Sequence, residues 1–306
     1  MTTNAFIFPG QGSQYPGMGK ELAENFRVAA DTFVEADDSL GFNLSRICFE
    51  GSEEELKLTA NTQPAILTVS IAILRVIRSE TSITSAYLAG HSLGEFSALV
   101  AAGALSFKDA VRTVRARGSY MQDAVPVGVG TMAAILGVEP DILADICREA
   151  AQGEIVAPAN FNSPGQIVIA GHVGAVGRAI DIAKGRGFRK AMLLPVSAPF
   201  HSTLMCPAGV RLAESLEEVQ VHPLQIPVVT NVEASPNMDC ARVKELLVRQ
   251  VSAPVLWEAS VLRMVDEGVG RFLEIGPGKV LSGLVKRITK NAETSNVEDS
   301  TSLRAL

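Results

Sequence analysis

The stretch LAGHSLGEFSALVAAGAL, residues 88–105, contains a Gly-x-Ser-x-Gly pentapeptide at 90–94, where an apolar run ends and a run of small residues begins. This order predicts a strand, a sharp turn and a helix, which is the context in which the pattern presents its serine. Ser92 is therefore a candidate nucleophile, and the Leu93 N–H at the start of the helix can face a developing oxyanion. The alternative is that Ser92 only caps the helix and that the glycines are structural, which the pentapeptide alone leaves open.

The same alternation of short apolar runs and helical patterns continues through most of the chain. The runs AFIFP (5–9), AYLAG (86–90) and RFLEI (271–275) are typical of buried parallel strands. The segment at 63–78 has the length and period of a buried helix. We therefore expect an α/β fold whose large domain, residues 1–127 and 196–306, is α/β-hydrolase-like and is built on a parallel sheet.

Residues 128–195 break this rhythm. Their patterns follow the order strand, helix, strand, strand, helix, strand. That βαββαβ order is typical of a ferredoxin-like module, which we expect as a small subdomain inserted into the large domain. The tail at 291–306 is polar and rich in Ser and Thr, so we expect it to be frayed.

Composition narrows the class of function. The chain has 306 residues, of which 47% are hydrophobic and 20% charged, and its formal net charge is −6. These values fit a soluble globular protein and do not favour a nucleic-acid partner. Four scattered cysteines, with no CxxC pair and no histidine at ligand spacing, predict reduced thiols and no metal site. With no signal peptide and no apolar run of about 18 residues, we expect a cytoplasmic protein and no membrane partner.

A serine nucleophile needs a base and an oxyanion hole. The glycine-rich turn PGQGSQ (9–14) follows the first strand, so its N–H groups are candidates for a second oxyanion donor. Among four histidines, His201 follows a strand and opens a helical run at the edge of the sheet, where the helix dipole favours a neutral imidazole. The other three are poorer candidates, because His91 adjoins Ser92, whereas His172 and His222 lie in polar turns and are expected to face solvent.

The helical pattern of residues 106–122 contains an arginine that does not lie on the solvent face. Its apolar positions form one stripe, Arg112 lies on the opposite face, and Arg117 lies at the margin of the stripe. A guanidinium that faces inward needs an anion. Spacing leaves two possibilities open, an internal salt bridge or a bidentate clamp on a substrate carboxylate.

Five motifs, taken together, resemble those of a known family. In chain order they are FPGQGSQ (8–14), GHSLGE (90–95), RARGSYMQ (115–122), ANFNSPGQIVIAG (159–171) and SAPFHS (197–202). The set is similar to malonyl-CoA:acyl-carrier-protein transacylases, the malonyl-loading enzymes of fatty-acid synthesis, and to the acyltransferase domains of polyketide synthases. The resemblance covers residues 5 to about 288.

This resemblance implies a role for each matching position. Ser92 would be the acylated nucleophile, and His201 would act as its general base and then as general acid. The main-chain carbonyl of Gln250 would orient His201, and Arg117 would pair with the malonyl carboxylate. The oxyanion-hole N–H groups would come from Gln11 and Leu93. The walls of the acyl pocket would include Gln63, Met121 and Phe200.

The implied reaction transfers a malonyl group from malonyl-CoA to the phosphopantetheine thiol of an acyl carrier protein. It passes through a malonyl-serine in ping-pong order, and it uses no cofactor beyond these thioester substrates. We expect the enzyme to be a monomer, and the carrier can belong to fatty-acid or polyketide synthesis. Two basic clusters are candidate contacts for an acidic carrier, Lys184, Arg186, Arg189 and Lys190 in one, and Lys286, Arg287 and Lys290 in the other.

Two other functions compete with this interpretation. A serine esterase or thioesterase of the α/β-hydrolase type shares the pentapeptide, but its histidine lies near the C-terminus, unlike His201, and it does not require the inserted module. A non-catalytic carrier-docking protein with the same fold is disfavoured because Ser92, His201 and Arg117 are all present.

Overall fold

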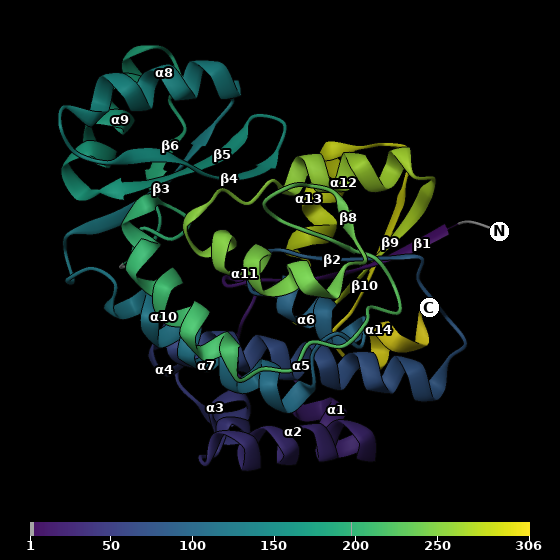
Figure 1. Ribbon diagram of the computed structural model, residues 1–306. Coiled ribbons are helices and arrows are strands. Elements are labelled where there is room, and N and C mark those ends of the chain that lie inside the picture. Colours follow the sequence, from purple (N-terminus) through teal and green to yellow (C-terminus); the bar gives the residue numbers. More distant parts are fainter. Residues whose placement is uncertain (1–2, 197) are drawn as a thin grey trace.

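A computed structural model describes residues 3–196 and 198–306. Residues 1–2, at the start of the expected large domain, and Ser197, the first residue of the SAPFHS motif, lie outside the described residues. Two sheets organise the chain, one of six strands and one of four (Figure 1). The fold is therefore mixed α/β, as predicted.

The large sheet has the strand order β10-β9-β1-β2-β7-β8. Its members are β1 (Thr3–Phe8), β2 (Tyr87–Gly90), β7 (Val228–Val229), β8 (Pro236–Asn237), β9 (Val269–Ile275) and β10 (Glu293–Val297). The strands from β10 to β7 pair in parallel, whereas β8 pairs antiparallel with β7. The three strands expected from sequence are confirmed as the adjacent set β9, β1 and β2.

Helices cover both faces of this sheet, so the central strand β1 is buried on both sides. Phe6 and Phe8 belong to the core shared with α2 (Arg27–Leu40), α5 (Thr59–Glu80), α6 (Gly94–Ala101) and α7 (Phe107–Asp123), whereas Ala5 and Ile7 pack with α12 (Trp257–Asp266) and α13 (Val280–Ile288). The N-terminal half contributes α1 (Lys20–Asn25), α2 (Arg27–Leu40), α3 (Leu44–Glu50), α4 (Glu53–Lys57), α5 (Thr59–Glu80), α6 (Gly94–Ala101) and α7 (Phe107–Asp123). The C-terminal half contributes η1 (Thr203–Met205), α10 (Cys206–Glu217), η2 (Cys240–Arg242), α11 (Val243–Ser252), α12 (Trp257–Asp266), α13 (Val280–Ile288) and α14 (Ser300–Arg304).

The helix predicted at 63–78 forms the middle and C-terminal part of α5. By length and composition, α5 is apolar enough to cross a membrane, but 89% of its most apolar window is buried inside the protein. It packs against α2 and α7 in the lower layer of Figure 1. The helix therefore serves here as a core element of the large domain.

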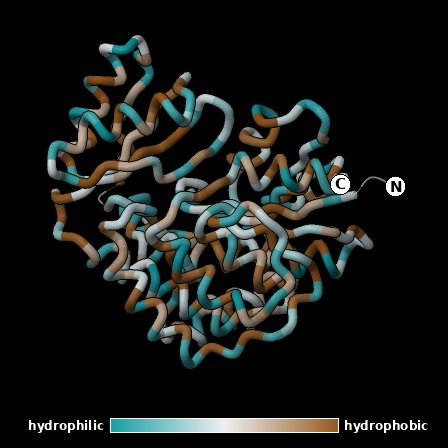
Figure 2. Tube along the Cα trace, turned by 45° about the horizontal axis from the view of Figure 1, so that its top comes forward, coloured by the Kyte–Doolittle hydropathy of each residue, from teal (hydrophilic) through white to brown (hydrophobic). Residues whose placement is uncertain are grey.

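The segment 128–195 folds as a separate antiparallel sheet of order β4-β5-β3-β6 with two helices packed on it. Its elements are β3 (Gly130–Leu136), α8 (Pro140–Ala151), β4 (Val156–Ser163), β5 (Gln166–His172), α9 (Val173–Gly185) and β6 (Ala191–Leu193). This confirms the predicted βαββαβ order. Figure 2 shows hydrophobic and hydrophilic residues alternating along this upper unit, as expected for elements that bury one face. Two backbone hydrogen bonds of 2.9 Å join the unit to the large domain: the Phe161 N–H donates to the Val255 carbonyl, and the Val255 N–H donates to the Ala159 carbonyl.

The prediction of a frayed C-terminal tail is wrong. Strand β10 extends the large sheet in parallel with β9, and Val297 is fully buried. Asp299 and Ser302 form a capping box at the start of α14, and the Ser300 N–H donates to Glu21 at 3.0 Å. The polar residues that suggested disorder thus act as caps and cross-links, and a single buried valine anchors the strand.

Candidate active site

Ser92 lies in the turn between β2 and α6, as predicted, and its backbone has a left-handed φ of 51°. The flanking glycines are required by close packing. A Cβ on Gly90 would lie 1.9 Å from the carbonyl carbon of Gly94, and one on Gly94 would lie 2.1 Å from the Phe8 carbonyl oxygen. The N-cap of α6 is Leu93, and the Ser92 hydroxyl contacts His201 and not the helix N-terminus. Ser92 is therefore not a helix cap.

His201 is positioned as a base for Ser92. Its Nε2 lies 2.8 Å from Ser92 Oγ, and its Nδ1 lies 2.8 Å from the main-chain carbonyl oxygen of Gln250. Because a carbonyl only accepts, Nδ1 carries the proton and Nε2 is free to accept from the serine. Burial and the neighbouring Arg117 cation lower the pKa of His201 to about 3, so the imidazole is neutral at physiological pH. The left-handed φ of 59° at His201 marks a second strained position in the site.

The other histidines have different partners, as the sequence indicates. His91 Nε2 lies 2.8 Å from Asn162 Oδ1, and its ring packs near Trp257. His222 is exposed. His172, expected to face solvent, is half-buried, and its Nδ1 accepts the N–H of Ile155 at 3.0 Å. His201 is therefore the histidine that the fold brings to the serine.

Arg117 is buried beside the nucleophile and is only 1% exposed. It donates to Gln63 Oε1 at 2.7 Å, to Gln250 Oε1 at 2.9 Å and to Ser92 Oγ at 3.2 Å. Within the described ranges, no carboxylate lies within salt-bridge distance of Arg117, and its Nε has no hydrogen-bond partner. Burial lowers its pKa to about 10, which still leaves the group charged at neutral pH. The geometry thus favours the clamp over the internal salt bridge.

The predicted oxyanion donors lie next to the nucleophile. Gln11 and Leu93 line the same cavity as Ser92, and in the part of the chain that the structure describes neither main-chain N–H has an acceptor. The loop that carries Gln11 is fixed by tight packing, because a Cβ on Gly10 would lie 2.4 Å from the His91 carbonyl oxygen. Two free N–H groups beside the serine are the arrangement that stabilises a tetrahedral oxyanion.

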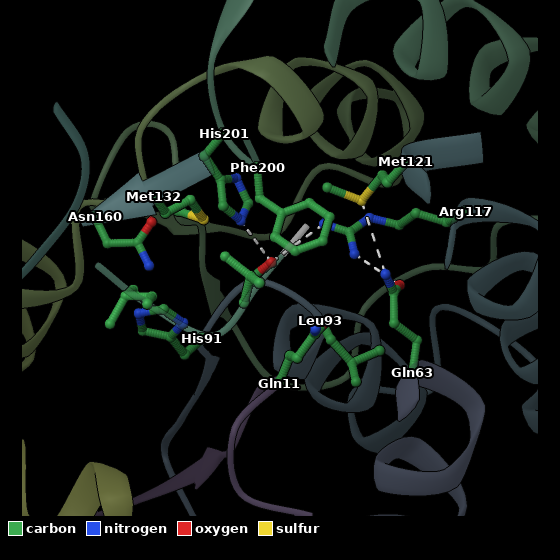
Figure 3. A pocket seen from close by; sticks show the side chains of 13 residues that line it. Gln11, Gln63, His91, Leu93, Arg117, Met121, Met132, Asn160, Phe200 and His201 are labelled. Carbon is green, nitrogen blue, oxygen red and sulfur yellow. Dashed lines mark hydrogen bonds between the residues drawn. The ribbon is translucent and has the colours of Figure 1, made fainter. Parts of the chain in front are cut away.

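The cavity has a volume of about 120 Å³ and is lined by both polar and apolar side chains. Figure 3 shows Arg117 beside Gln63 and Met121 on one side of the cavity and His201 on the other. The three predicted wall residues, Gln63, Met121 and Phe200, all line this cavity. The cavity also contains residues to which the sequence analysis gave no role, Met132, Asn160, Leu194 and Val196. Asn160 lies in a quoted motif, but Met132 comes from the small subdomain and nothing in its local pattern distinguishes it from core.

Sequence reasoning also missed a buried polar network behind the nucleophile. Asn231 Oδ1 accepts the Ser92 N–H at 2.6 Å, and the Asn231 side chain donates to the Gly90 carbonyl at 2.7 Å. Glu95, 2% exposed, accepts from the Asn231 N–H and from the side-chain amide of Gln250. Burial raises the pKa of Glu95 to about 7. The one sequence feature that could have indicated this network is the position of Glu95, a charged residue in the otherwise apolar helix α6.

The donor set of the site is that of an acyl-transfer centre. It combines a hydroxyl, a neutral imidazole, two free N–H groups and a guanidinium. Across residues 3–196 and 198–306, no group of three His, Cys, Asp or Glu side chains is arranged to hold a metal ion.

Comparison with known proteins agrees with this geometry. The acyl transferase domain family matches residues 5–304. The chain is 51% identical over 300 residues to the malonyl CoA-acyl carrier protein transacylase of Bacillus subtilis, covering 98% of this chain and 94% of that protein. It superposes with a TM-score of 0.97 on an acyl carrier protein S-malonyltransferase from Vibrio cholerae, at 48% identity and 99% coverage of both chains.

A further solved structure is a malonyl-transacylase in complex with a type II PKS acyl-carrier protein. It has a TM-score of 0.97 and 47% identity, and the match covers 99% of this chain and 98% of that one. The domain match spans nearly all of the chain, and the relatives align over almost their full length. The chain therefore belongs to the acyl transferase domain family.

Proposed function

We propose that the protein transfers a malonyl group from malonyl-CoA to the phosphopantetheine thiol of an acyl carrier protein. One observation carries this proposal. Arg117 is buried, has no carboxylate partner in the described chain, and lies 3.2 Å from the Ser92 hydroxyl, which is itself hydrogen-bonded to the His201 imidazole. Such a site accepts an acyl group that itself ends in a carboxylate. The activities named for the relatives from B. subtilis and V. cholerae support the same substrate class.

In the loading step, Ser92 Oγ attacks the thioester carbonyl carbon of malonyl-CoA while His201 Nε2 takes the serine proton. The carbonyl oxygen becomes an oxyanion that the N–H groups of Gln11 and Leu93 stabilise. Collapse of this intermediate forms the serine ester and breaks the C–S bond. The imidazolium then gives its proton to the departing coenzyme A thiolate.

In the transfer step, the same groups act in reverse order. His201 takes the proton of the carrier thiol, whose sulfur attacks the ester carbonyl, and the Ser92 oxygen leaves with that proton. The products are the malonyl-carrier and the free enzyme, so the two substrates react in ping-pong order. No cofactor is needed, because each proton and each bond is accounted for by the serine, the histidine and the two thioesters.

A neutral base at physiological pH leads to a testable pH dependence. The neutral form of His201 is the reactive form, and it is lost only as pH falls through its pKa of about 3. We therefore expect kcat/KM for loading, once the titration of Glu95 is removed, to be flat from about pH 5 to 8 with malonyl-N-acetylcysteamine, a donor without titrating phosphates. Because Glu95 has a pKa of about 7, the Glu95→Gln variant is the control. An acid limb near the ordinary histidine pKa of about 6.5 that persists in this variant would contradict the assignment.

A serine hydrolase is the alternative that shares this site. The two functions differ in the acceptor that attacks the acyl-enzyme. We expect the malonyl-enzyme to react much faster with a holo carrier protein than with water, measured as carrier acylation against release of free malonate. Faster hydrolysis in the presence of excess carrier would favour an esterase.

The carrier surface can be tested through the two basic clusters, whose members are all exposed. Arg186 pairs with Glu149 at 2.5 Å and Arg287 donates to Gln166 at 2.5 Å, so these two are best left intact. Reversing the charge of the remaining members should raise KM for an acidic carrier and weaken its salt dependence, with loading from malonyl-CoA near normal. The variant carries Glu at each of the positions Lys184, Arg189, Lys190, Lys286 and Lys290.

A control for these clusters reverses two exposed charges on helices beneath the large sheet, Arg27 and Lys108. This control should leave the carrier KM unchanged. If carrier kinetics at low salt are unaffected in the cluster variant as well, the docking surface lies elsewhere on the protein.

Several finer assignments belong to the same proposal. We propose that the large domain is α/β-hydrolase-like and that the small subdomain is ferredoxin-like, since its βαββαβ order and antiparallel sheet agree with that motif. We also propose that the enzyme acts as a monomer in the cytoplasm, where malonyl-CoA and the carrier would be available to it.

A further inference from the structure

Glu95 is a buried carboxylate that the catalytic steps above do not use. It lies one helical turn after the nucleophile, in α6, and does not line the cavity. Its Oε2 accepts two hydrogen bonds, from the Asn231 N–H at 3.0 Å and from Gln250 Nε2 at 2.8 Å. Burying an ionisable group at 2% exposure is costly, so its partners in the fold call for an explanation.

Two hydrogen-bond paths lead from Glu95 to the reacting groups. In the first, Gln250 Nε2 donates to Glu95 while Gln250 Oε1 accepts from Arg117 Nη2 at 2.9 Å. In the second, Glu95 holds the Asn231 backbone, and Asn231 Oδ1 accepts the Ser92 N–H at 2.6 Å. Glu95 therefore contacts neither reacting group directly, yet it is one residue away from both.

The first path depends on which way an amide points. The two ends of the Gln250 amide are alike in shape, but one end only donates and the other only accepts. An ionised carboxylate can only accept, so Glu95, together with the Ser92 carbonyl oxygen at 3.0 Å, selects the NH₂ end and leaves the oxygen end for Arg117. A flipped amide would place two donors face to face in a buried site, which is strongly unfavourable.

We infer that Glu95 is a positioning residue for the carboxylate clamp: it fixes the orientation of the Gln250 amide, and that amide holds Arg117 toward the substrate. The inference rests on the proposed function, because the clamp matters only if the acyl group carries a carboxylate.

The indirect arrangement has a physical advantage. A protein carboxylate in direct contact with Arg117 would compete with the carboxylate of the substrate. The guanidinium is instead held by the neutral amide oxygens of Gln63 and Gln250, and Glu95 acts on the cation through the Gln250 amide and by its charge, without touching it. Arg117 thus keeps its charge in a buried site while remaining available to an incoming anion.

Two conservative variants separate the accepting oxygen from the negative charge. Glu95→Asp keeps the charge but withdraws the acceptor by one methylene. Glu95→Gln removes the charge but keeps an acceptor oxygen, because the Asn231 N–H donates to this position and holds the oxygen end of the new amide toward Gln250 Nε2. The readout is the ratio of kcat/KM for malonyl-CoA to that for acetyl-CoA in acylating the enzyme, measured at pH 8, where Glu95 of the wild type is ionised. This ratio does not depend on the fraction of folded enzyme.

We expect Glu95→Asp to lower the ratio about tenfold, the scale of losing one charge-assisted hydrogen bond. Glu95→Gln should restore it close to the wild-type value. The matched control is Ser97→Ala, also buried in α6, whose hydroxyl has no hydrogen-bond partner among the described residues; it should leave the ratio unchanged.

Each outcome decides a different point. An unchanged ratio in Glu95→Asp, or an equal fall in Glu95→Gln, would overturn the inference, the second because charge and not the accepting oxygen would be responsible. If Glu95→Asp does not fold, Glu95→Gln still tests the inference, since it must keep the ratio. A wild-type enzyme that is not malonylated at all would refute the proposed function instead.

Discussion

Replacing Ser92 with Ala should abolish both acylation of the enzyme by malonyl-CoA and transfer of the malonyl group to a carrier. The variant removes the hydroxyl that lies 2.8 Å from His201 Nε2 and within 3.2 Å of the Arg117 guanidinium. When a nucleophile and its base act as a unit, losing the nucleophile costs on the order of 10⁴-fold or more in rate. Intact-mass analysis of acylation and an assay of carrier loading measure the two losses separately.

Ser97→Ala is the matched control for this change as well, because it removes a hydroxyl from the first turn of α6, the helix that begins two residues after Ser92. It should acylate at close to the wild-type rate. Stoichiometric malonylation of the Ser92→Ala protein would show that another group is the nucleophile.

Arg117→Ala should reverse much of the preference for malonyl over acetyl donors. The variant leaves the substrate carboxylate without its cation in a buried site, which we expect to raise the malonyl-transfer barrier by about 3 kcal/mol, roughly a hundredfold in kcat/KM. Acetyl transfer should fall far less, because an acetyl group makes no ion pair with this arginine. Measuring kcat/KM with both donors gives the change in their ratio.

The control for Arg117 is Arg112→Ala, which removes an exposed arginine from the same helix, α7. It should leave both donors unaffected. If Arg117→Ala lowers the two donors by the same factor, the arginine is structural and the clamp is wrong. The thermal unfolding midpoint should be recorded too, because this variant leaves the amides of Gln63 and Gln250 without a donor.

Local sequence patterns were sufficient to predict the strand, turn and helix that hold the candidate nucleophile Ser92. The glycines around Ser92 and the apolar run before it predicted the turn, because steric crowding between a strand and a helix is a short-range property. The Arg117 position was equally readable, since a single helix places it on an inward margin. The resemblance implied three wall residues, Gln63, Met121 and Phe200, and all three line the cavity.

Long-range contacts account for what the sequence did not predict. Asn231 and Gln250 form hydrogen bonds with the Ser92 backbone although they lie 139 and 158 residues away in the sequence. No local pattern therefore predicts the Asn231 contact. Met132 joins the cavity only because the small subdomain lies over the large one. The C-terminal tail was misjudged for the same reason, as its order depends on pairing with β9 and on contacts with Glu21 near the other end of the chain.

The central claim is that Ser92 carries the malonyl group between two thiols. The most direct test mixes the enzyme with malonyl-CoA in the absence of a carrier, maps the added mass by protease digestion, and then adds a holo acyl carrier protein. We predict a gain of one malonyl group on the peptide that contains Ser92, followed by its quantitative appearance on the carrier. A malonyl group on any other peptide, or one that the carrier cannot remove, would contradict the account.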